Sequence, residues 1–135
     1  MVVDRQDIPL AVRLSAADVH DSRMMLDTTD AIEPIQRPVG RPRKRPKKLH
    51  TDKAYDSRPL RDELRRRGIT PRIARKGFES SERLGRCRWV VERTGAWLNC
   101  FRRLRIRYER RDDIHQAFLD LGCARICWNF LQQGF

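Results

Sequence analysis

Short apolar runs and polar turns at the start of the chain predict a hairpin followed by a helix. Two β-prone runs, residues 2–4 and 8–14, are separated by the polar segment Arg5-Gln6-Asp7, which indicates a turn between paired strands. Residues 21–32 mix apolar and acidic side chains and predict a helix that is closed by Pro34.

The middle of the chain predicts a strand, a helix and a second strand. A brief β-like run over residues 49–51 ends at Asp52. Residues 56–59 combine capping side chains with a proline, which is typical of a helix start, and Gly68 is suited to end that helix. Residues 69–74 then predict a strand.

The last part of the chain, after a connecting loop over residues 75–81, predicts two helices. Spacings of four and three give one long helix a buried face at Val90, Thr94, Trp97, Phe101, Leu104 and Tyr108. A second helix starts at Asp112 or Asp113 and repeats the stripe at Ala117, Leu121, Ala124, Trp128 and Leu131. The element order predicts a single α/β domain over residues 1–135, with helices packed on a small mixed sheet.

The composition points to a polyanionic partner. Thirty Lys and Arg against 18 Asp and Glu give a formal net charge of +12 and a pI near 10.7. A protein with this charge attracts nucleic acid from a distance. No apolar run approaches the roughly 20 residues that span a bilayer, and residues 1–9 lack the layout of a secretory signal. We therefore expect a cytoplasmic protein without membrane contact.

One basic segment, residues 37–48, reads RPVGRPRKRPKK and cannot form a packed element. We expect an exposed, extended loop that contacts DNA through Arg41, Arg43, Lys44, Arg45, Lys47 and Lys48. Its spacing around Gly40-Arg41-Pro42 resembles an AT-hook, which lies in a narrow minor groove. The alternative is a nonspecific tether to phosphates.

A second basic cluster follows on the long predicted helix and its exit. The expected phosphate contacts are Arg102, Arg103, Arg105, Arg107, Arg110 and Arg111, on the outer face while apolar neighbours pack inward. Arg65, Arg66 and Arg67 are expected to extend the basic surface. The three tryptophans, Trp89, Trp97 and Trp128, are interpreted as core residues.

Two acids are candidates for metal chemistry. Asp52 ends a predicted strand, where open α/β sheets place working groups, although from position alone a strand-end aspartate is more often a turn or cap residue. Glu92 projects opposite the apolar stripe, and a solvated glutamate near Arg88 is the alternative. Transfer of a phosphodiester uses two divalent cations about 4 Å apart, and carboxylates suit Mg²⁺ or Mn²⁺.

The cysteines offer a further alternative. Cys87, Cys100, Cys123 and Cys127 lie in predicted helices and are interpreted as reduced, buried thiols. A zinc site would need Cys123 and Cys127 together with His115, with a spacing that matches known zinc modules poorly.

Several motifs in one order carry a family resemblance. They are DKAYDS from residue 52, RRRGI from residue 65, LGRCRWVVERTGAWLNCFRRLRIRYERR from residue 84, DIHQAF from residue 113 and PLAVRLSAADVHDS from residue 9. Together they resemble the second half of a bacterial insertion-sequence transposase of the DDE type. The resemblance implies a ribonuclease H-like catalytic domain, Mg²⁺-dependent cleavage and strand transfer at the ends of an element, and a location at the bacterial nucleoid.

By that resemblance Asp52 corresponds to the second acid of the catalytic triad and Glu92 to the third, both metal ligands. Arg88 matches the arginine of the family's tyrosine-arginine-glutamate-lysine signature, while the tyrosine and lysine positions fall on Gly85 and Asn99. The implied reaction is in-line attack by water and then by a DNA 3′-hydroxyl, without a covalent enzyme intermediate.

The first aspartate of the triad has no counterpart, because the family places it on a strand ahead of the hairpin and Asp4 lies at the turn. We therefore expect this chain to be one part of the catalytic domain, incomplete and inactive alone. Its expected partners are double-stranded DNA, the N-terminal part of the transposase and a further copy in a homo-oligomer. The alternatives are a non-catalytic remnant or inhibitor that binds DNA, and a ribosomal-type RNA binder, which explains the charge alone.

Overall fold

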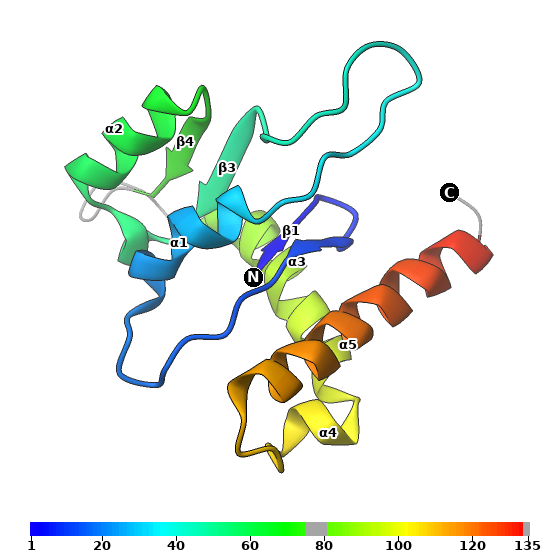
Figure 1. The fold of residues 1–135 in the computed structure, drawn as a ribbon. Helices are drawn as coiled ribbons and strands as arrows, with labels where there is room; N and C mark the ends of the chain where they lie inside the picture. The colour runs from blue at the N-terminus through cyan, green and yellow to red at the C-terminus, as the bar shows by residue number, and fades with distance from the viewer. Residues whose placement is uncertain (75–80, 134–135) are drawn as a thin grey trace.

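The computed structural model describes residues 1–74 and 81–133 and has a mixed α/β architecture (Figure 1). The strands form two separate two-stranded sheets, where the sequence pattern predicted one small mixed sheet. Both sheets contact the long helix α3 (Ser81–Asn99), which therefore joins them. None of the described helices combines the length and apolar composition needed to cross a bilayer.

The predicted N-terminal hairpin is confirmed. β1 (Val2–Val3) pairs antiparallel with β2 (Pro9–Ala11). The Asp4 carboxylate holds the turn by accepting hydrogen bonds from the backbone N–H groups of Gln6, at 2.8 Å, and Ile8, at 2.9 Å. Asp7 completes the turn with a φ of 68°, a left-handed conformation that aspartate tolerates better than most residues.

The second sheet is built around the predicted strand, helix and strand. β3 (Lys48–Thr51) runs parallel to β4 (Thr70–Ile73), and helix α2 (Arg58–Arg66) connects them. The Ser57 hydroxyl caps α2 by accepting from the N–H of Leu60, as the sequence predicted. Gly68 ends the helix with a φ of 74°.

The core lies between this sheet, α2 and helix α1 (Asp21–Asp30). Its buried side chains come from α1, α2, β3, β4 and the residue before β4, and Val2 of the hairpin packs against them. They are Met25, Leu49, Leu60, Leu64, Ile69 and Ile73. The alternation of buried and exposed residues along β3 places Leu49 inward and His50 outward. The hairpin and the parallel sheet therefore share one core even though their strands are not hydrogen-bonded to each other.

The predicted long helix through Tyr108 is wrong. α3 ends at Asn99, Phe101 is extended, and α4 (Arg102–Arg105) is a separate short helix. The interruption turns the chain, so that Phe101 and Leu104 reach helix α5 (Asp112–Gln133), whereas a straight helix would carry them past it. Tyr108, at the end of the predicted stripe, is exposed.

The predicted buried face of α5 is also wrong. Leu121, Trp128 and Leu131 are 65%, 53% and 60% exposed, and Ala117 and Ala124 are exposed as well. The buried face instead carries His115, Gly122 and Ile126. Apolar residues occur on both sides of α5, and packing selected the side with the glycine.

Gly122 explains that choice. A Cβ at this position would lie 2.8 Å from Cδ1 of Leu104 and 3.0 Å from Cδ2 of Leu98. The missing side chain therefore lets α5 approach α3 and α4 closely. A larger residue on this face would hold the helices apart.

We predict that Gly122→Leu lowers the free energy of unfolding by about 1–3 kcal/mol, because the new side chain overpacks the contact with Leu98 and Leu104. Gly95→Ala is the matched control, since a Cβ there meets nothing within 4 Å, and alanine should raise helix stability by about 1 kcal/mol. Chemical denaturation followed by circular dichroism measures both. Equal effects of the two substitutions would contradict the close packing at Gly122.

Candidate metal and DNA-binding site

Asp52 lies where β3 ends, as the sequence predicted. Its carboxylate accepts a hydrogen bond from the N–H of Lys53 at 2.6 Å and caps the 3₁₀ turn η1 (Lys53–Tyr55). The side chain is half-buried, and the preceding hydroxyl of Thr51 is buried with no hydrogen-bond partner among the described residues. The cap fixes the position of Asp52 and uses one oxygen, which leaves the other for a further ligand.

Glu92 lies on α3, the helix that packs against β3 and β1. Its side chain is exposed, on the opposite side of the helix from the buried Thr94 and Leu98. Asp52 and Glu92 thus belong to neighbouring elements, but no group of three or more potential metal ligands occurs within residues 1–74 and 81–133. The side chain of Arg88 lies outside the described part.

An ion pair to a buried carboxylate fixes α3 against the hairpin. The Asp7 carboxylate is 1% exposed and pairs with the guanidinium of Arg93. That guanidinium stands 5.8 Å from the centre of the Trp89 ring and 5.5 Å from that of Trp97, so two aromatic faces hold it. The hydroxyl of Thr94, fully buried, donates to the backbone carbonyl of Asp7 at 3.0 Å.

These contacts fix the rotation of α3 about its own axis relative to the hairpin. Because Arg93 and Thr94 both face Asp7, the preceding residue, Glu92, is turned away from the hairpin contact.

Sequence reasoning missed Asp7 and Arg93. The available signal was an arginine with tryptophans four residues before and after it, which share one helix face and indicate a held guanidinium.

The charges around the end of β3 are of both signs. Burial raises the pKa of Tyr55, and the carboxylates of Asp21 and Asp52 raise it further. Two residues before Asp52, burial lowers the pKa of His50, with added repulsion from Arg72 and Lys48. Two carboxylates near Tyr55 and two cationic strand residues near His50 therefore lie around this sheet.

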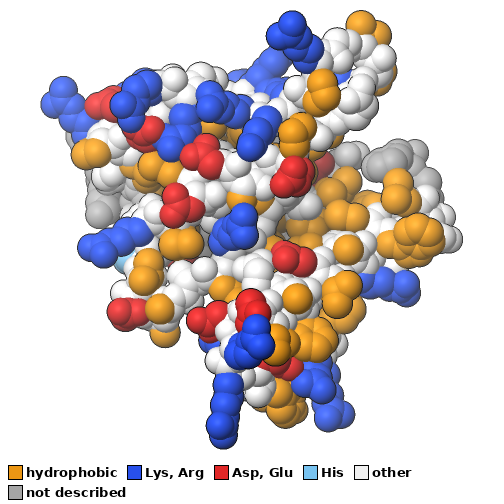
Figure 2. All heavy atoms as spheres, viewed as in Figure 1, with side chains coloured by type: hydrophobic (Ala, Val, Ile, Leu, Met, Phe, Trp, Pro, Cys, Tyr) orange, Lys and Arg blue, Asp and Glu red, His pale blue; other side chains and the backbone are white. Residues whose placement is uncertain are grey.

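The predicted basic loop, residues 37–48, is exposed except near its base, and it projects from the body of the molecule (Figure 1). Backbone hydrogen bonds of 2.9 and 2.8 Å join Ile35 to Arg43 and close residues 36–42. The loop ends one residue earlier than predicted, because Lys48 is the first residue of β3. Gly40, at the tip beside Arg41, has a φ of 93°, which favours glycine. Figure 2 shows Lys and Arg side chains gathered over this side of the molecule.

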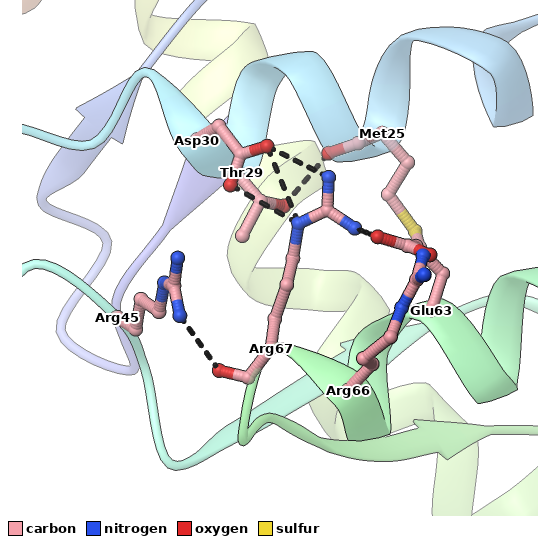
Figure 3. A network of polar contacts seen from close by, with 7 residues as sticks. All are labelled: Met25, Thr29, Asp30, Arg45, Glu63, Arg66 and Arg67. Atoms are coloured by element: carbon pink, nitrogen blue, oxygen red, sulfur yellow. Dashed lines mark hydrogen bonds and ion pairs between the residues drawn. The ribbon is translucent and has the colours of Figure 1, made fainter.

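The base of the loop is anchored to α2 through a polar network (Figure 3). The Arg45 guanidinium donates to the carbonyl of Arg67 at 3.4 Å, and the Arg67 guanidinium pairs with Asp30 at 2.9 Å and also with Glu63. An open hollow of about 420 Å³ lies among these residues and Lys44. The loop is thus tied to both α1 and α2.

Acids offset part of the predicted basic surface. Arg65 pairs with Asp62, and Arg66 and Arg67 pair with Glu63. These three arginines therefore add less positive potential than their number indicates.

The second cluster is likewise partly paired. Arg103 pairs with Glu109 at 2.7 Å, Arg107 with Asp112 and Arg111 with Asp113. Arg102 and Arg105 are exposed on α4. The prediction that these arginines lie on the long helix and its exit was wrong, because they lie on the separate helix α4 and on the segment after it.

The cysteine and tryptophan expectations have mixed outcomes. Burial raises the pKa of Cys123 to about 11 and also raises that of Cys127, which suits unreactive thiols, whereas Cys100 is exposed. Among the described residues no cluster of potential ligands supports the zinc alternative, and His115 Nδ1 lies 3.6 Å from a carboxylate oxygen of Glu109.

The tryptophans differ in their burial. Trp97 packs on Phe130, but Trp89 and Trp128 are 60% and 53% exposed, so their assignment to the core was wrong.

Comparison with known proteins identifies relatives. Residues 1–127 match the model of a family described as the transposase DDE domain. Over 133 residues the chain is 52% identical to a protein from Burkholderia cepacia named as a proposed transposase for insertion sequence element IS402. The match covers 98% of this chain and 63% of the relative, so the chain spans less than two thirds of that protein. No solved structure gives a significant match.

We predict that Asp7→Asn lowers the free energy of unfolding by about 2 kcal/mol, because the buried partner of Arg93 loses its charge while asparagine still tolerates the left-handed turn. Asp18→Asn, at an exposed position, is the control. Thermal or urea unfolding measures the difference. Indistinguishable stabilities of the two variants would show that the pair does not hold α3.

Proposed function

The chain belongs to the transposase DDE domain family, and we propose that it forms the C-terminal part of the catalytic domain of an insertion-sequence transposase. The observation that carries the proposal is that Asp52 ends β3 while Glu92 lies on α3, the helix packed against that strand. Parallel β3 and β4 with a helical crossover, preceded by a hairpin, match the element order of a ribonuclease H-like domain. The proposed reaction is cleavage and strand transfer of DNA at element ends.

Asp52 and Glu92 would hold divalent cations in this proposal. Both offer hard carboxylate oxygens, which suit Mg²⁺ or Mn²⁺, and Asp52 is already held in place by its bond to Lys53. Bound cations of this kind stabilise the attacking and leaving oxygens of a phosphodiester. Two carboxylates supply only part of a ligand set, so a further acid must come from another segment.

Arg88 is proposed as a positioning residue. It comes four residues before Glu92 in the sequence, and side chains four apart on a helix are neighbours, so in this proposal it would steady the Glu92 carboxylate or bind a DNA phosphate. This role rests on the match to the family signature and on helix geometry.

The N-terminal part of a transposase is the proposed source of the further acid. Each strand of the two sheets has a single strand partner, so β1 and β3 each keep one open edge. Both strands lie on α3, which places the open edges on a common support. A strand added there would join the sheets and bring its side chains beside Asp52.

The proposed DNA surface is led by the basic loop. Six cations come from this segment: Arg41 lies within the part closed by the bridge between Ile35 and Arg43, Arg43 is in the bridge, Lys44, Arg45 and Lys47 follow it, and Lys48 begins β3. A tether to phosphates requires only this charge. Minor-groove entry would in addition use Arg41 beside Gly40 and Pro42 at the tip. Arg102, Arg103, Arg105 and Arg107 would contribute further phosphate contacts from α4 and the segment after it.

A non-catalytic DNA-binding role is the second candidate. It is favoured by the lack of a three-ligand group among the described residues. Such a protein would occupy element ends without cutting them. An adjoining reading frame that encodes a strand with an aspartate would support the enzyme, and a genomic context without one would support this candidate.

We predict that Asp52→Ala and Glu92→Ala each reduce Mg²⁺-dependent cleavage to background in a transposase completed by its N-terminal part, because each removes a metal ligand. Binding of a labelled element-end duplex should change less than about twofold in either variant. Asp62→Ala is the control, since Asp62 is exposed and pairs only with neighbours on α2 among the contacts described. Retained cleavage in either test variant would remove that residue from the site.

We predict that Arg41→Ala combined with Lys44→Ala weakens DNA binding and reduces the slope of log affinity against log salt by about 2, since about 0.9 is lost per phosphate contact. Arg65→Ala, whose partner is Asp62, should leave the slope nearly unchanged. Fluorescence anisotropy with AT-rich and GC-rich duplexes measures both. Equal losses on the two duplexes indicate a phosphate tether, a larger loss on AT-rich DNA indicates minor-groove entry, and an unchanged slope contradicts contact by the loop.

A further inference from the structure

α5 has apolar residues on two faces. The inner face packs on α3 and α4 through Gly122 and Ile126. The outer face is defined by six exposed side chains, Ile114, Ala117, Leu121, Ala124, Trp128 and Leu131. The C-terminal half of α5 extends away from the other elements (Figure 1), and hydrophobic side chains gather on that side of the molecule (Figure 2). A surface helix normally carries one apolar face toward the core, so a second apolar face on α5 indicates a further contact surface.

The spacing on the outer face is that of a coiled-coil seam. Ile114, Leu121 and Trp128 recur every seven residues, and so do Ala117, Ala124 and Leu131. The two series alternate at intervals of three and four, as positions a and d do in a heptad. From residue 114 to residue 131 the seam is about 26 Å long at 1.5 Å per residue. This pattern suits a second helix more than a small ligand.

From this face we infer that a second copy of the chain covers it, with the two α5 helices antiparallel about a two-fold axis. In an antiparallel pair each a position faces a d position of the other helix. Centred between residues 122 and 123, this pairing sets Trp128 against the second copy's Ala117, and Leu121 against its Ala124. Each large side chain thus meets a small one, and the same contacts occur twice by symmetry.

The surface already has room for the largest of these side chains. A groove of about 270 Å³ is lined by Asp113, Ile114, Ala117, Phe118 and Leu121. Ala117 forms its floor in the proposed pairing, and the second copy's Trp128 would enter it. The exposed indole of Trp128 and the groove at Ala117 are therefore the two halves of one contact.

The flanking charges are compatible with this register. Arg125 comes opposite the second copy's Phe118, and Asp120 comes opposite its Cys127, so like charges do not face each other. A parallel pair would instead stack Trp128 on Trp128 and Ala124 on Ala124, which overfills one layer and leaves the next empty. The antiparallel arrangement is the one in which every layer is filled. The inference is independent of the proposed catalytic role.

The first experiment measures the mass of the full chain in solution by light scattering after size-exclusion chromatography, over a dilution series. A chain of 16.0 kDa should elute at twice that mass. Leu121→Glu and Trp128→Glu should each weaken the dimer at least about tenfold, since a charge is buried in the seam. Asn129→Glu adds the same charge on an exposed part of α5 off the seam and should leave the dimer intact. Circular dichroism establishes that each variant retains its helices.

The second experiment tests the register. Ala124→Lys alone should also dissociate the dimer, whereas Leu121→Glu combined with Ala124→Lys should restore it, because each glutamate then faces a lysine of the second copy. A monomeric wild-type chain, dimers in both glutamate variants, or dissociation by Asn129→Glu would overturn the inference. Failure of the double variant to restore the dimer would overturn the antiparallel register. A monomeric wild type would instead leave the face to a segment such as the one by which the Burkholderia cepacia relative is longer.

Discussion

The arrangement of this domain depends on the contacts between Asp7 and helix α3. The buried Asp7 carboxylate forms an ion pair with Arg93, and the Asp7 backbone carbonyl accepts a hydrogen bond from the hydroxyl of Thr94. Because the hairpin and the parallel sheet are not hydrogen-bonded to each other, α3 is the element that relates them. The left-handed turn at Asp7 thus sets the direction in which Glu92 points, and it links a feature of local backbone geometry to the proposed chemistry.

Local signals were sufficient for the first half of the fold. The hairpin, α2 with its Ser57 cap and Gly68 end, and the strand before Asp52 were all predicted from turn and cap chemistry, which acts over a few residues. The family was identified from short motifs in a fixed order, and the comparisons confirm it. The metal-binding roles of Asp52 and Glu92 remain predictions, since they rest on those motifs and on the packing of α3 against β3.

Tertiary packing determines which face of a helix is buried when sequence periodicity allows two. α5 has two apolar faces, and the face with Gly122 is buried because the absence of a side chain there allows close contact with Leu98 and Leu104. The break after Asn99 has the same origin, because it lets Phe101 and Leu104 turn toward α5. Asp7 was missed for a related reason: its partner Arg93 is more than 80 residues away along the chain, beyond the range of any local pattern.

The bridge between Ile35 and Arg43 has a thermodynamic consequence. Two backbone hydrogen bonds hold Ile35 and Arg43 together and so order the tip of the basic loop in the protein without DNA. A free segment of the same composition would lose conformational entropy at every residue that it ordered on a duplex. Part of that cost is met here during folding, so in the proposed DNA complex more of the electrostatic attraction of the loop would appear as affinity.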